Sequence, residues 1–197
     1  MIDINLKARL GKSKEKIVLE LEKKGAKVKK GKESIDRVFI KKDLKFNINS
    51  KYNLLDEGIL NIKNEEDKIF INLKKNNKKA GKIIELESLV SDEEEIVEII
   101  KLIGYEECFK IKRKRTKYLL DGISINIDYI EDLDYFIEVN KTVDNEKEEC
   151  IVRDNIYELL SSVGIKDEDY ILDSYETLMY KNKYSKLWRN EVENFGK

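Results

Sequence analysis

The first ten residues, MIDINLKARL, alternate without interruption between apolar and polar side chains. A period of two is typical of a β-strand, in which residues i and i+2 share a face. Ile4 and Leu6 therefore lie on one face of the predicted strand. Asp3, Asn5 and Lys7 lie on the other face, so that an acid, an amide and a base stand in one row.

Two further strands repeat this arrangement, and each of the three runs into a segment of helical periodicity that ends at a glycine. Each strand carries two polar residues two positions apart and thus on one face. The polar pairs are Asp3/Asn5, Glu85/Glu87 and Glu138/Asn140, and the glycines are Gly25, Gly104 and Gly164. The helices are expected to begin at Ser13 as an N-cap, at a capping box of Ser91 and Glu94, and at about Lys147.

The stretches between these units favour strands, because they lack helical periodicity. They cover about 36–41, 44–49, 58–63, 69–75, 108–119 and 122–129, with turns at Asn76, Asn77 and Gly81 and at Asp121-Gly122. The sequence thus predicts roughly eight or nine strands and three helices. We assign the chain to the α+β class, because a doubly wound parallel sheet would need more helices.

The polar faces of the predicted strands carry both signs of charge, and they face either bulk water or the inside of a closed barrel. The basic members are Lys7, Lys63, Lys74, Arg113 and Arg115, and the acidic members are Asp3, Glu85, Glu87, Asp128 and Glu138. Like charges about 4 Å apart repel by roughly 4 kcal/mol near a protein surface. Converging bases therefore favour a bound phosphate chain, and converging acids favour a metal ion, which together suit polyphosphate chemistry.

The composition narrows the chemistry further. The 197 residues include 39 basic and 40 acidic ones, and histidine is absent. The charge balance argues against a protein that coats nucleic acid through a basic field, and the absence of histidine excludes Ser-His triads and imidazole metal sites. A metal would be held by carboxylates, which favours magnesium or manganese. Two cysteines outside a CxxC pattern, no signal peptide and no long apolar run predict a cytoplasmic protein that does not bind membranes.

Short motifs in the first half of the chain resemble the CYTH superfamily, also called triphosphate tunnel metalloenzymes. The family's opening ExExK resembles Asp3–Lys7, and the acid of its DxYF stretch resembles Asp36 in IDRVF. Its LRIR resembles LNIK, which aligns the second base with Lys63. Its LTxKG resembles INLKK, which aligns the lysine with Lys74.

The second half continues the resemblance in order, and the whole match runs from residue 2 to about 180. The family's RxExE resembles IIELE, and its KxRxxY resembles RKRTKY, which contains Arg113 and Arg115. Its LDxVxxLGxFxExE resembles IDYIEDLDYFIEVN, which aligns Asp128 and Glu138. SYETLM, which contains Tyr175, resembles the SYxxLL stretch of the class IV adenylate cyclase branch.

The resemblance implies an eight-stranded antiparallel β-barrel that encloses a triphosphate tunnel, with helices packed on the outside. It implies a single tunnel domain at 1–180, followed by a C-terminal helix or tail at 181–197. In the family, basic tunnel residues bind a triphosphate, and carboxylates bind one or two divalent metal ions. Members hydrolyse inorganic triphosphate, thiamine triphosphate or RNA 5′ triphosphate, or they cyclise ATP.

Carried over position by position, the resemblance implies the roles of particular residues. The implied substrate-binding residues are Lys7, Lys63, Lys74, Arg113 and Arg115, the implied ligands of Mg²⁺ or Mn²⁺ are Glu85, Glu87, Asp128, Glu138 and Asp3, and the implied catalytic residues are Lys74 and Glu138. We therefore expect a metal-dependent triphosphatase or class IV adenylate cyclase whose partner is a triphosphate-bearing small molecule. Nucleic acid and membranes are disfavoured as partners, and a homodimer is left open.

Five positions depart from the family pattern, namely Asp3, Asn5, Asn61, Ile83 and Asn140. The amides at positions 5 and 140 each remove an acid, and the residues at 61 and 83 each remove a base, so the net charge changes little. A lost charged contact to phosphate costs about 1.5–3 kcal/mol, so two losses weaken binding roughly 10²–10⁴-fold. The alternative is therefore a non-catalytic nucleotide- or polyphosphate-binding CYTH protein with a degenerate tunnel. A third hypothesis is contact with nucleic acid through KIKRKRTKY.

Overall fold

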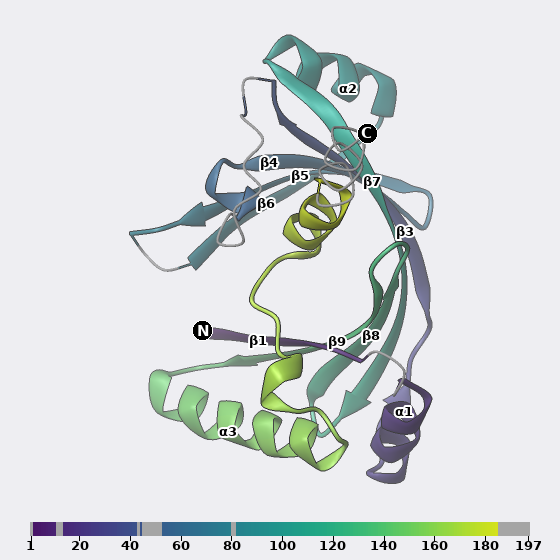
Figure 1. Cartoon of the computed structure of the whole chain (residues 1–197), viewed down its shortest axis with the longest axis vertical. Coiled ribbons are helices and arrows are strands. Elements are labelled where there is room, and N and C mark those ends of the chain that lie inside the picture. The colour runs from purple at the N-terminus through teal and green to yellow at the C-terminus, as the bar shows by residue number, and fades with distance from the viewer. Residues whose placement is uncertain (1, 11–13, 43, 45–52, 80–81, 185–197) are drawn as a thin grey trace, which may run out of the picture. The chain divides into compact units, whose positions relative to one another are not determined.

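A computed structural model describes residues 2–10, 14–42, 44, 53–79 and 82–184 of the chain. The chain divides into two compact units, each assembled from two separate stretches of sequence (Figure 1). Unit 1 comprises Met1–Lys32 and Arg113–Leu172, and unit 2 comprises Glu33–Lys112 and Asp173–Lys197. The predicted single tunnel domain at 1–180 with a tail at 181–197 stays a prediction.

Unit 1 holds an antiparallel set of strands in the order β1-β9-β8-β7. Its elements are β1 (Ile2–Arg9), α1 (Lys14–Lys23), β2 (Lys27–Val28), β8 (Ile123–Ile130), β9 (Asp134–Val143), α3 (Glu146–Ser162), the short 3-10 helix η3 (Asp167–Asp169) and the second half of β7 (Tyr105–Leu120). The short β2 pairs with β7 as well. Because Leu6 lies opposite Val139, and Val139 opposite Ile125, the apolar positions of neighbouring strands fall on the same face.

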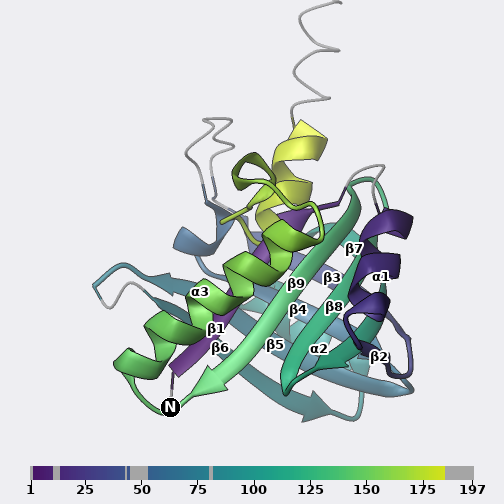
Figure 2. The ribbon, with the colours of Figure 1, turned by 90° about the horizontal axis from the view of Figure 1, so that it is seen from below.

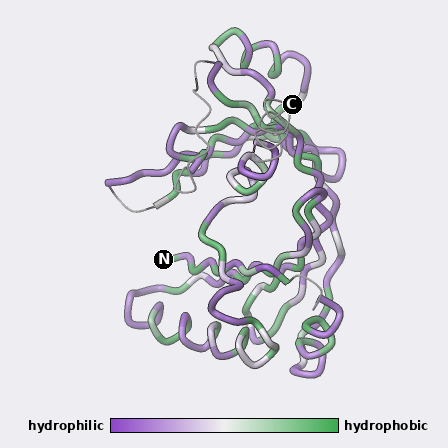
Figure 3. Tube along the Cα trace, viewed as in Figure 1, coloured by the Kyte–Doolittle hydropathy of each residue, from purple (hydrophilic) through white to green (hydrophobic). Residues whose placement is uncertain are grey.

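The core of unit 1 lies where its two long helices cover that apolar face. α3 packs on β1 and β9 (Figure 2). Ile4 and Ala8 of β1 pack in one cluster with Leu21 of α1 and with Ile156 and Leu160 of α3, and all five are almost completely buried. Colouring by hydropathy shows hydrophilic and hydrophobic residues following one another along the strands (Figure 3). The opposite, polar face is thus left to carry the charged side chains.

Unit 2 holds the remaining strands in the order β7-β3-β4-β5-β6. Its elements are β3 (Lys32–Lys41), the 3-10 helix η2 (Leu54–Asp56), β4 (Ile59–Glu65), β5 (Lys68–Asn77), β6 (Lys82–Val90), α2 (Glu93–Leu102), the first half of β7 and the helical residues 175–184. Val97 and Ile100 of α2 pack against Phe39, Leu60 and Ile62 on one face of this sheet. Asn61 and Lys63 alternate with those apolar residues and therefore belong to the other face.

The predicted fold class, α+β with antiparallel strands, is confirmed. Eight strands follow one path of antiparallel pairs, and β2 joins it at β7. The Asp121-Gly122 turn between β7 and β8 is confirmed as well, because both residues have the positive φ angles, 47° and 73°, that such a hairpin turn requires. The sequence did not predict the similar turn at Glu66 and Asp67, whose φ angles are 49° and 62°.

The capping box predicted for the second helix was wrong by one residue. The N-cap of α2 is Asp92, which has an extended backbone, and its side chain accepts a hydrogen bond of 3.0 Å from the backbone nitrogen of Glu95. Ser91 lies outside the helix because β6 runs up to Val90. The predicted N-cap Ser13, the turn residue Gly81 and nearly all of the predicted strand at 44–49 lie outside the described residues.

None of the helices in the described part of the chain combines the length and the apolar character needed to cross a lipid bilayer.

The Asp92 cap is expected to stabilise unit 2 measurably. Replacing Asp92 by Ala removes the carboxylate that accepts from the Glu95 N–H, and such losses cost about 1 kcal/mol. Urea denaturation should therefore show a free energy of unfolding lowered by about 1 kcal/mol for Asp92→Ala. The adjacent Ser91→Ala serves as the control and should match the wild type. A larger loss for Ser91→Ala than for Asp92→Ala would restore the capping box that the sequence predicted.

Candidate functional site

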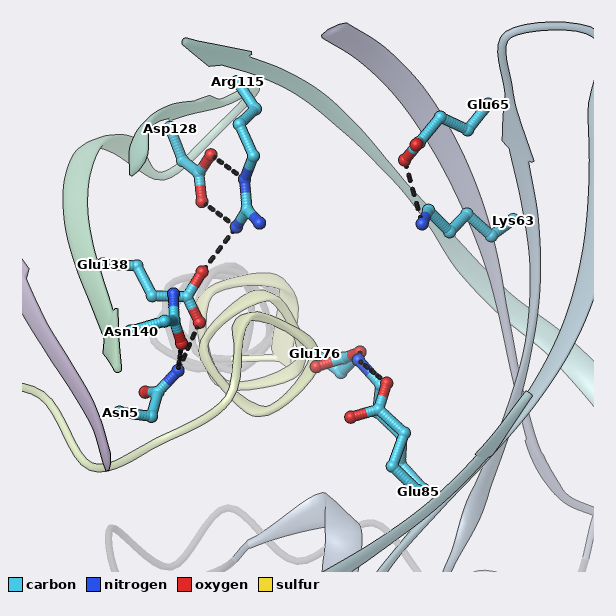
Figure 4. A network of polar contacts seen from close by, with 10 residues as sticks. Asn5, Lys63, Glu65, Glu85, Arg115, Asp128, Glu138, Asn140 and Glu176 are labelled. Carbon is cyan, nitrogen blue, oxygen red and sulfur yellow. Dashed lines mark hydrogen bonds and ion pairs between the residues drawn. The ribbon is translucent and has the colours of Figure 1, made fainter. Parts of the chain in front are cut away.

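Arg115 is the centre of a charged network on the polar face of unit 1 (Figure 4). Its Nε donates to Oδ1 of Asp128 at 2.7 Å and its Nη2 donates to Oδ2 at 2.6 Å, which is a bidentate pair. The same Nη2 also donates to Oε2 of Glu138. Asp128 has no exposed surface, and Glu138 keeps 16% of its side chain exposed. One guanidinium therefore contacts two carboxyl groups that are largely removed from water.

The other oxygen of Glu138 is held by the amides of β1 and β9. Asn5 Nδ2 donates to Glu138 Oε1 and to Asn140 Oδ1, each at 2.7 Å. Burial by itself raises the pKa of Glu138, but the charge of Arg115, the hydrogen bond from Asn5 and the charge of Lys7 outweigh it and lower that pKa. Glu138 is therefore an ionised carboxylate at neutral pH. The two amides that replace the family's acids still contact it or each other.

The remaining predicted residues of unit 1 lie on the same polar face. Lys7 is the β1 residue opposite Glu138, and Asp3 accepts a hydrogen bond of 2.7 Å from Thr142 Oγ1. Arg113 is half-buried and lies two residues before Arg115, so the two arginines share a face. Arg115, Asp128 and Glu138 are brought into direct contact.

Lys74 is the corresponding base in unit 2. Its Nζ lies 2.9 Å from Glu176 Oε1 and 3.6 Å from Glu85 Oε1. Burial by itself lowers the pKa of Lys74, but the charges of Glu176 and Glu85 more than offset it and raise that pKa. Lys74 is therefore a permanently charged ammonium between two carboxylates.

Two buried amides brace these carboxylates. Asn61 Nδ2 donates to Glu176 Oε1 at 3.0 Å, and Asn72 Nδ2 donates to Glu85 Oε1 at 2.9 Å. The two asparagines lie opposite each other on β4 and β5, and each is only 3% exposed. Within the described residues, the Oδ1 atoms of both amides are buried without a hydrogen-bond partner. Buried acceptors of this kind are typical partners of water or of a ligand's donors.

The last predicted residues of unit 2 are Lys63 and Glu87. Lys63 Nζ lies 2.9 Å from Glu65 Oε2 and 5.6 Å from the centre of the Phe70 ring. Glu87 is exposed on β6 opposite Asn72. Lys63 and Lys74 thus both have a carboxylate partner in unit 2. Glu85, which the sequence predicted as a metal ligand, contacts Lys74 and Asn72.

Glu176 is a functional candidate that the sequence did not predict. It lies in SYETLM, at one of the variable positions of the SYxxLL stretch. It follows the cap residue Ser174, whose Oγ accepts a hydrogen bond of 3.2 Å from the backbone nitrogen of Thr177. An acid in the first turn of a helix is favoured by the helix dipole, and this local effect gave no indication of its contact with Lys74. Tyr175 is buried, in agreement with a packing role.

The predicted metal ligands are carboxylates, which are of the chemical type that binds magnesium or manganese, but too few of them lie together to form a complete site. In the part of the chain that the structure describes, no three Asp, Glu, Cys or His side chains gather as a metal site. Glu138 Oε1 and Asn140 Oδ1 nevertheless converge on one point, since both lie 2.7 Å from Asn5 Nδ2. Mg²⁺ is usually held by one or two carboxylates, with water and substrate phosphates completing its shell. These oxygens fit such an ion, and rotation of the Asn5 amide would add a third.

The comparison with known proteins settles the family. The CYTH domain matches residues 1–175, and the chain therefore belongs to the CYTH family. This confirms the resemblance of the motifs. The family binds triphosphate substrates and is metal-dependent.

Individual relatives agree with this assignment. The protein named Putative adenylate cyclase MJ0240 from Methanocaldococcus jannaschii is 29% identical over 178 residues, which cover 89% of this chain and 97% of that protein. The PH1012 protein of Pyrococcus horikoshii has a similar fold, with a TM-score of 0.67 and 24% identity over 88% of this chain and 97% of that one. HpAC1 from Hippeastrum, described as a putative adenylyl cyclase with a dominant triphosphatase activity, matches with a TM-score of 0.60 and 16% identity over 88% of this chain and 91% of that one.

Removal of the guanidinium of Arg115 is expected to destabilise unit 1, because Asp128 and Glu138 would both lose the cation that they contact. The expected loss for Arg115→Gln is about 3 kcal/mol at pH 7 by urea denaturation. Arg153→Gln is the control, since Arg153 pairs with Glu149 on the surface of α3, where such pairs contribute at most about 0.5 kcal/mol.

Arg115→Gln should also reverse the way in which the contribution of Glu138 to the free energy of unfolding depends on pH. In the wild type the pKa of Glu138 is lowered, so its stabilisation is present above the ordinary carboxylate pKa and is lost as the pH falls through the lowered value. In Arg115→Gln the pKa of Glu138 should instead rise, and the deficit relative to wild type should shrink on acidification. A Glu138 resonance that titrates identically in both proteins by carboxyl-carbon NMR would contradict this account of the network.

Proposed function

We propose that this protein is a metal-dependent enzyme that acts on a triphosphate-containing substrate, as a triphosphatase or as a class IV adenylate cyclase. The observation that carries the proposal is that a base in contact with two acidic side chains occupies the polar sheet face in each unit. Arg115 is held by Asp128 and Glu138 in unit 1, and Lys74 is held by Glu176 and Glu85 in unit 2. In a CYTH chain, such bases are suited to bind phosphate.

The basic residues would bind the phosphates by exchanging their more exposed carboxylate partners, such as Glu85 beside Lys74, for phosphate oxygens. Arg115 is suited to this exchange because its guanidinium already forms a bidentate pair with Asp128, and a phosphate presents oxygens at a similar spacing. Lys74 offers a compact ammonium that is charged at any pH relevant to function. Lys7, Lys63 and Arg113 are the further candidates for phosphate binding.

A divalent ion would be held in unit 1 by Glu138 together with the amide oxygens of Asn5 and Asn140. When bound, it supplies neutralisation of the charge that develops on the phosphoryl oxygens. Arg115 would keep Glu138 ionised and fixed in orientation for this role, because it binds the carboxylate oxygen that Asn5 does not. Magnesium and manganese are the candidates, since the donors are oxygen atoms of carboxylate and amide groups.

The second candidate is a binding protein without turnover. It is favoured by the replacement of family acids and bases with Asn5, Asn61 and Asn140, which removes charge that the reaction would use.

The attacking group separates the two enzymatic activities. A triphosphatase directs water to the terminal phosphorus, whereas a cyclase directs the ribose 3′-OH to the α-phosphorus.

An assay with defined substrates tests the proposal. Purified protein with Mg²⁺ or Mn²⁺ is given tripolyphosphate, ATP or thiamine triphosphate, and the release of phosphate, pyrophosphate and cyclic AMP is measured. Turnover is expected, and Lys74→Ala or Glu138→Ala should lower kcat/KM about 10–100-fold each, because a charged contact contributes about 1.5–3 kcal/mol. Lys75→Ala is the matched control, since Lys75 is the exposed neighbour on β5 whose side chain lies on the opposite face.

The outcome separates the candidates. Calorimetric binding of tripolyphosphate without turnover would replace the enzyme with the non-catalytic binder. Neither turnover nor binding, combined with salt-sensitive binding to nucleic acid, would favour the third hypothesis.

Metal binding is tested separately by titrating Mn²⁺ and following the free ion by electron paramagnetic resonance. Glu138→Gln should weaken Mn²⁺ binding at least about tenfold, because it removes the one carboxylate of the proposed oxygen set. Glu87→Gln should leave the binding unchanged. The opposite result, with binding lost only in Glu87→Gln, would assign the metal to the acids of β6.

A further inference from the structure

Glu176 lies beside Lys74 but is far less accessible to solvent. Its side chain is 5% exposed, whereas that of Lys74 is 25% exposed, and Glu176 Oε1 lies 2.9 Å from Lys74 Nζ. Lys74 is therefore the partner that is more accessible to a ligand approaching from solvent. Any anion that binds Lys74 would then lie close to the negative charge of the Glu176 carboxylate, which remains in place.

The position of Glu176 is fixed by the packing of its helical segment. Thr177 is completely buried, its Oγ1 donates to Asn53 Oδ1 at 3.0 Å, and it accepts from the Leu54 backbone nitrogen at 3.2 Å. Asn61 Nδ2 donates to the carboxylate itself at 3.0 Å. The helical residues 175–184 thus hold Glu176 against the polar face of β4 and β5, and its charge cannot move away when a ligand binds.

Glu176 also remains ionised across the range in which enzymes work. Burial by itself raises its pKa, but the charge and the hydrogen bond of Lys74 outweigh burial and lower the pKa of Glu176 to about 2. The Lys74–Glu176 pair is thus a base whose charge is largely balanced before any phosphate arrives. Glu85, at 3.6 Å from the same ammonium, reduces its attraction further.

We propose that Glu176 is a specificity residue which makes Lys74 discriminate against phosphate groups that carry two negative charges. A terminal phosphate carries two negative charges once its second proton is lost, near about pH 6 for a single group and at higher pH for the second of two groups on one chain, whereas an esterified or bridging phosphate carries one. The fixed carboxylate repels the first more strongly than the second. Inorganic tripolyphosphate has two terminal groups, and an organic triphosphate ester has one. The preferred ligand is therefore a triphosphate ester rather than inorganic tripolyphosphate.

This inference rests on the proposed function, because it assumes that Lys74 contacts phosphate. The test compares tripolyphosphate with methyl triphosphate, which has the same chain of phosphates but one terminal group fewer. Dissociation constants are measured by calorimetry at pH 9.5, where both terminal groups of tripolyphosphate are largely deprotonated, with EDTA present. The wild type should bind the ester more tightly. Glu176→Gln keeps the shape of the side chain and removes its charge. In this variant, the dissociation constant for the ester divided by that for tripolyphosphate should rise about tenfold.

Matched variants and a spectroscopic signal distinguish the effect of the Glu176 charge from a structural effect of the substitution. Glu98→Gln removes one charge from the exposed face of α2, where Glu98 contacts Lys101, and should leave the ratio unchanged. Glu176→Asp, which keeps the charge, should retain the preference for the ester. In Glu176→Gln the pKa of the Lys74 ammonium, followed by nitrogen NMR, should fall, whereas it should not move in Glu98→Gln.

The wild type provides a second test that does not depend on the folding of a variant. Protonation of terminal phosphates below about pH 6 leaves each with one charge, while Glu176 stays ionised. The preference for the ester should therefore vanish between pH 9.5 and pH 5.

The failures of the two proposals are distinguishable. An equal gain in affinity for both ligands in Glu176→Gln, or a wild-type ratio that does not change with pH, would overturn the specificity role while leaving the proposed function intact. Absence of binding of either ligand to the wild type, with no effect of Lys74→Ala, would overturn the proposed function and the specificity role with it.

Discussion

The cost of holding charge away from water is the constraint that governs the polar faces of both units. An ionised side chain in a partly buried position is tolerated only when it is paired and hydrogen-bonded. Arg115 meets this demand by contacting both Asp128 and Glu138, and Lys74 meets it through Glu176. Each base therefore lies beside acids that offset its charge, and each group of acids lies beside a base.

The same constraint explains how the amides in place of family acids and bases are accommodated. Asn5 takes the place of an acid but donates to Glu138, and Asn61 takes the place of a base but donates to Glu176. Each keeps a hydrogen bond to a carboxylate while carrying no charge. The substitutions therefore leave the polar networks connected while lowering the total charge available to a ligand, which favours a substrate with less charge or slower turnover over complete loss of the site.

Membership of the CYTH family gives the class of ligand, and the arrangement of these networks is compatible with the proposed binding of that ligand. The family assignment depends on the order of motifs over residues 1–175, whereas the networks depend on contacts between individual side chains. Under the proposed function, such a base would bind phosphate by exchanging its more exposed carboxylate partner for phosphate oxygens. Affinity and specificity then depend on how firmly each carboxylate is held, and Glu176, which is buried in a packed helical segment, is held more firmly than the half-exposed Glu85.

The sequence by itself determined the strands and which side chains share a face, because a period of two is a property of the backbone. It thereby placed Arg115, Asp128 and Glu138 on polar faces, and the ordered motifs identified the family. Only the tertiary structure decided which charges pair. Glu176 lies 102 positions from Lys74 along the chain, and no local pattern encodes a contact at that separation. Even the cap at Asp92 depended on where β6 ends, because strand pairing and packing, rather than residue type, select among neighbouring polar residues.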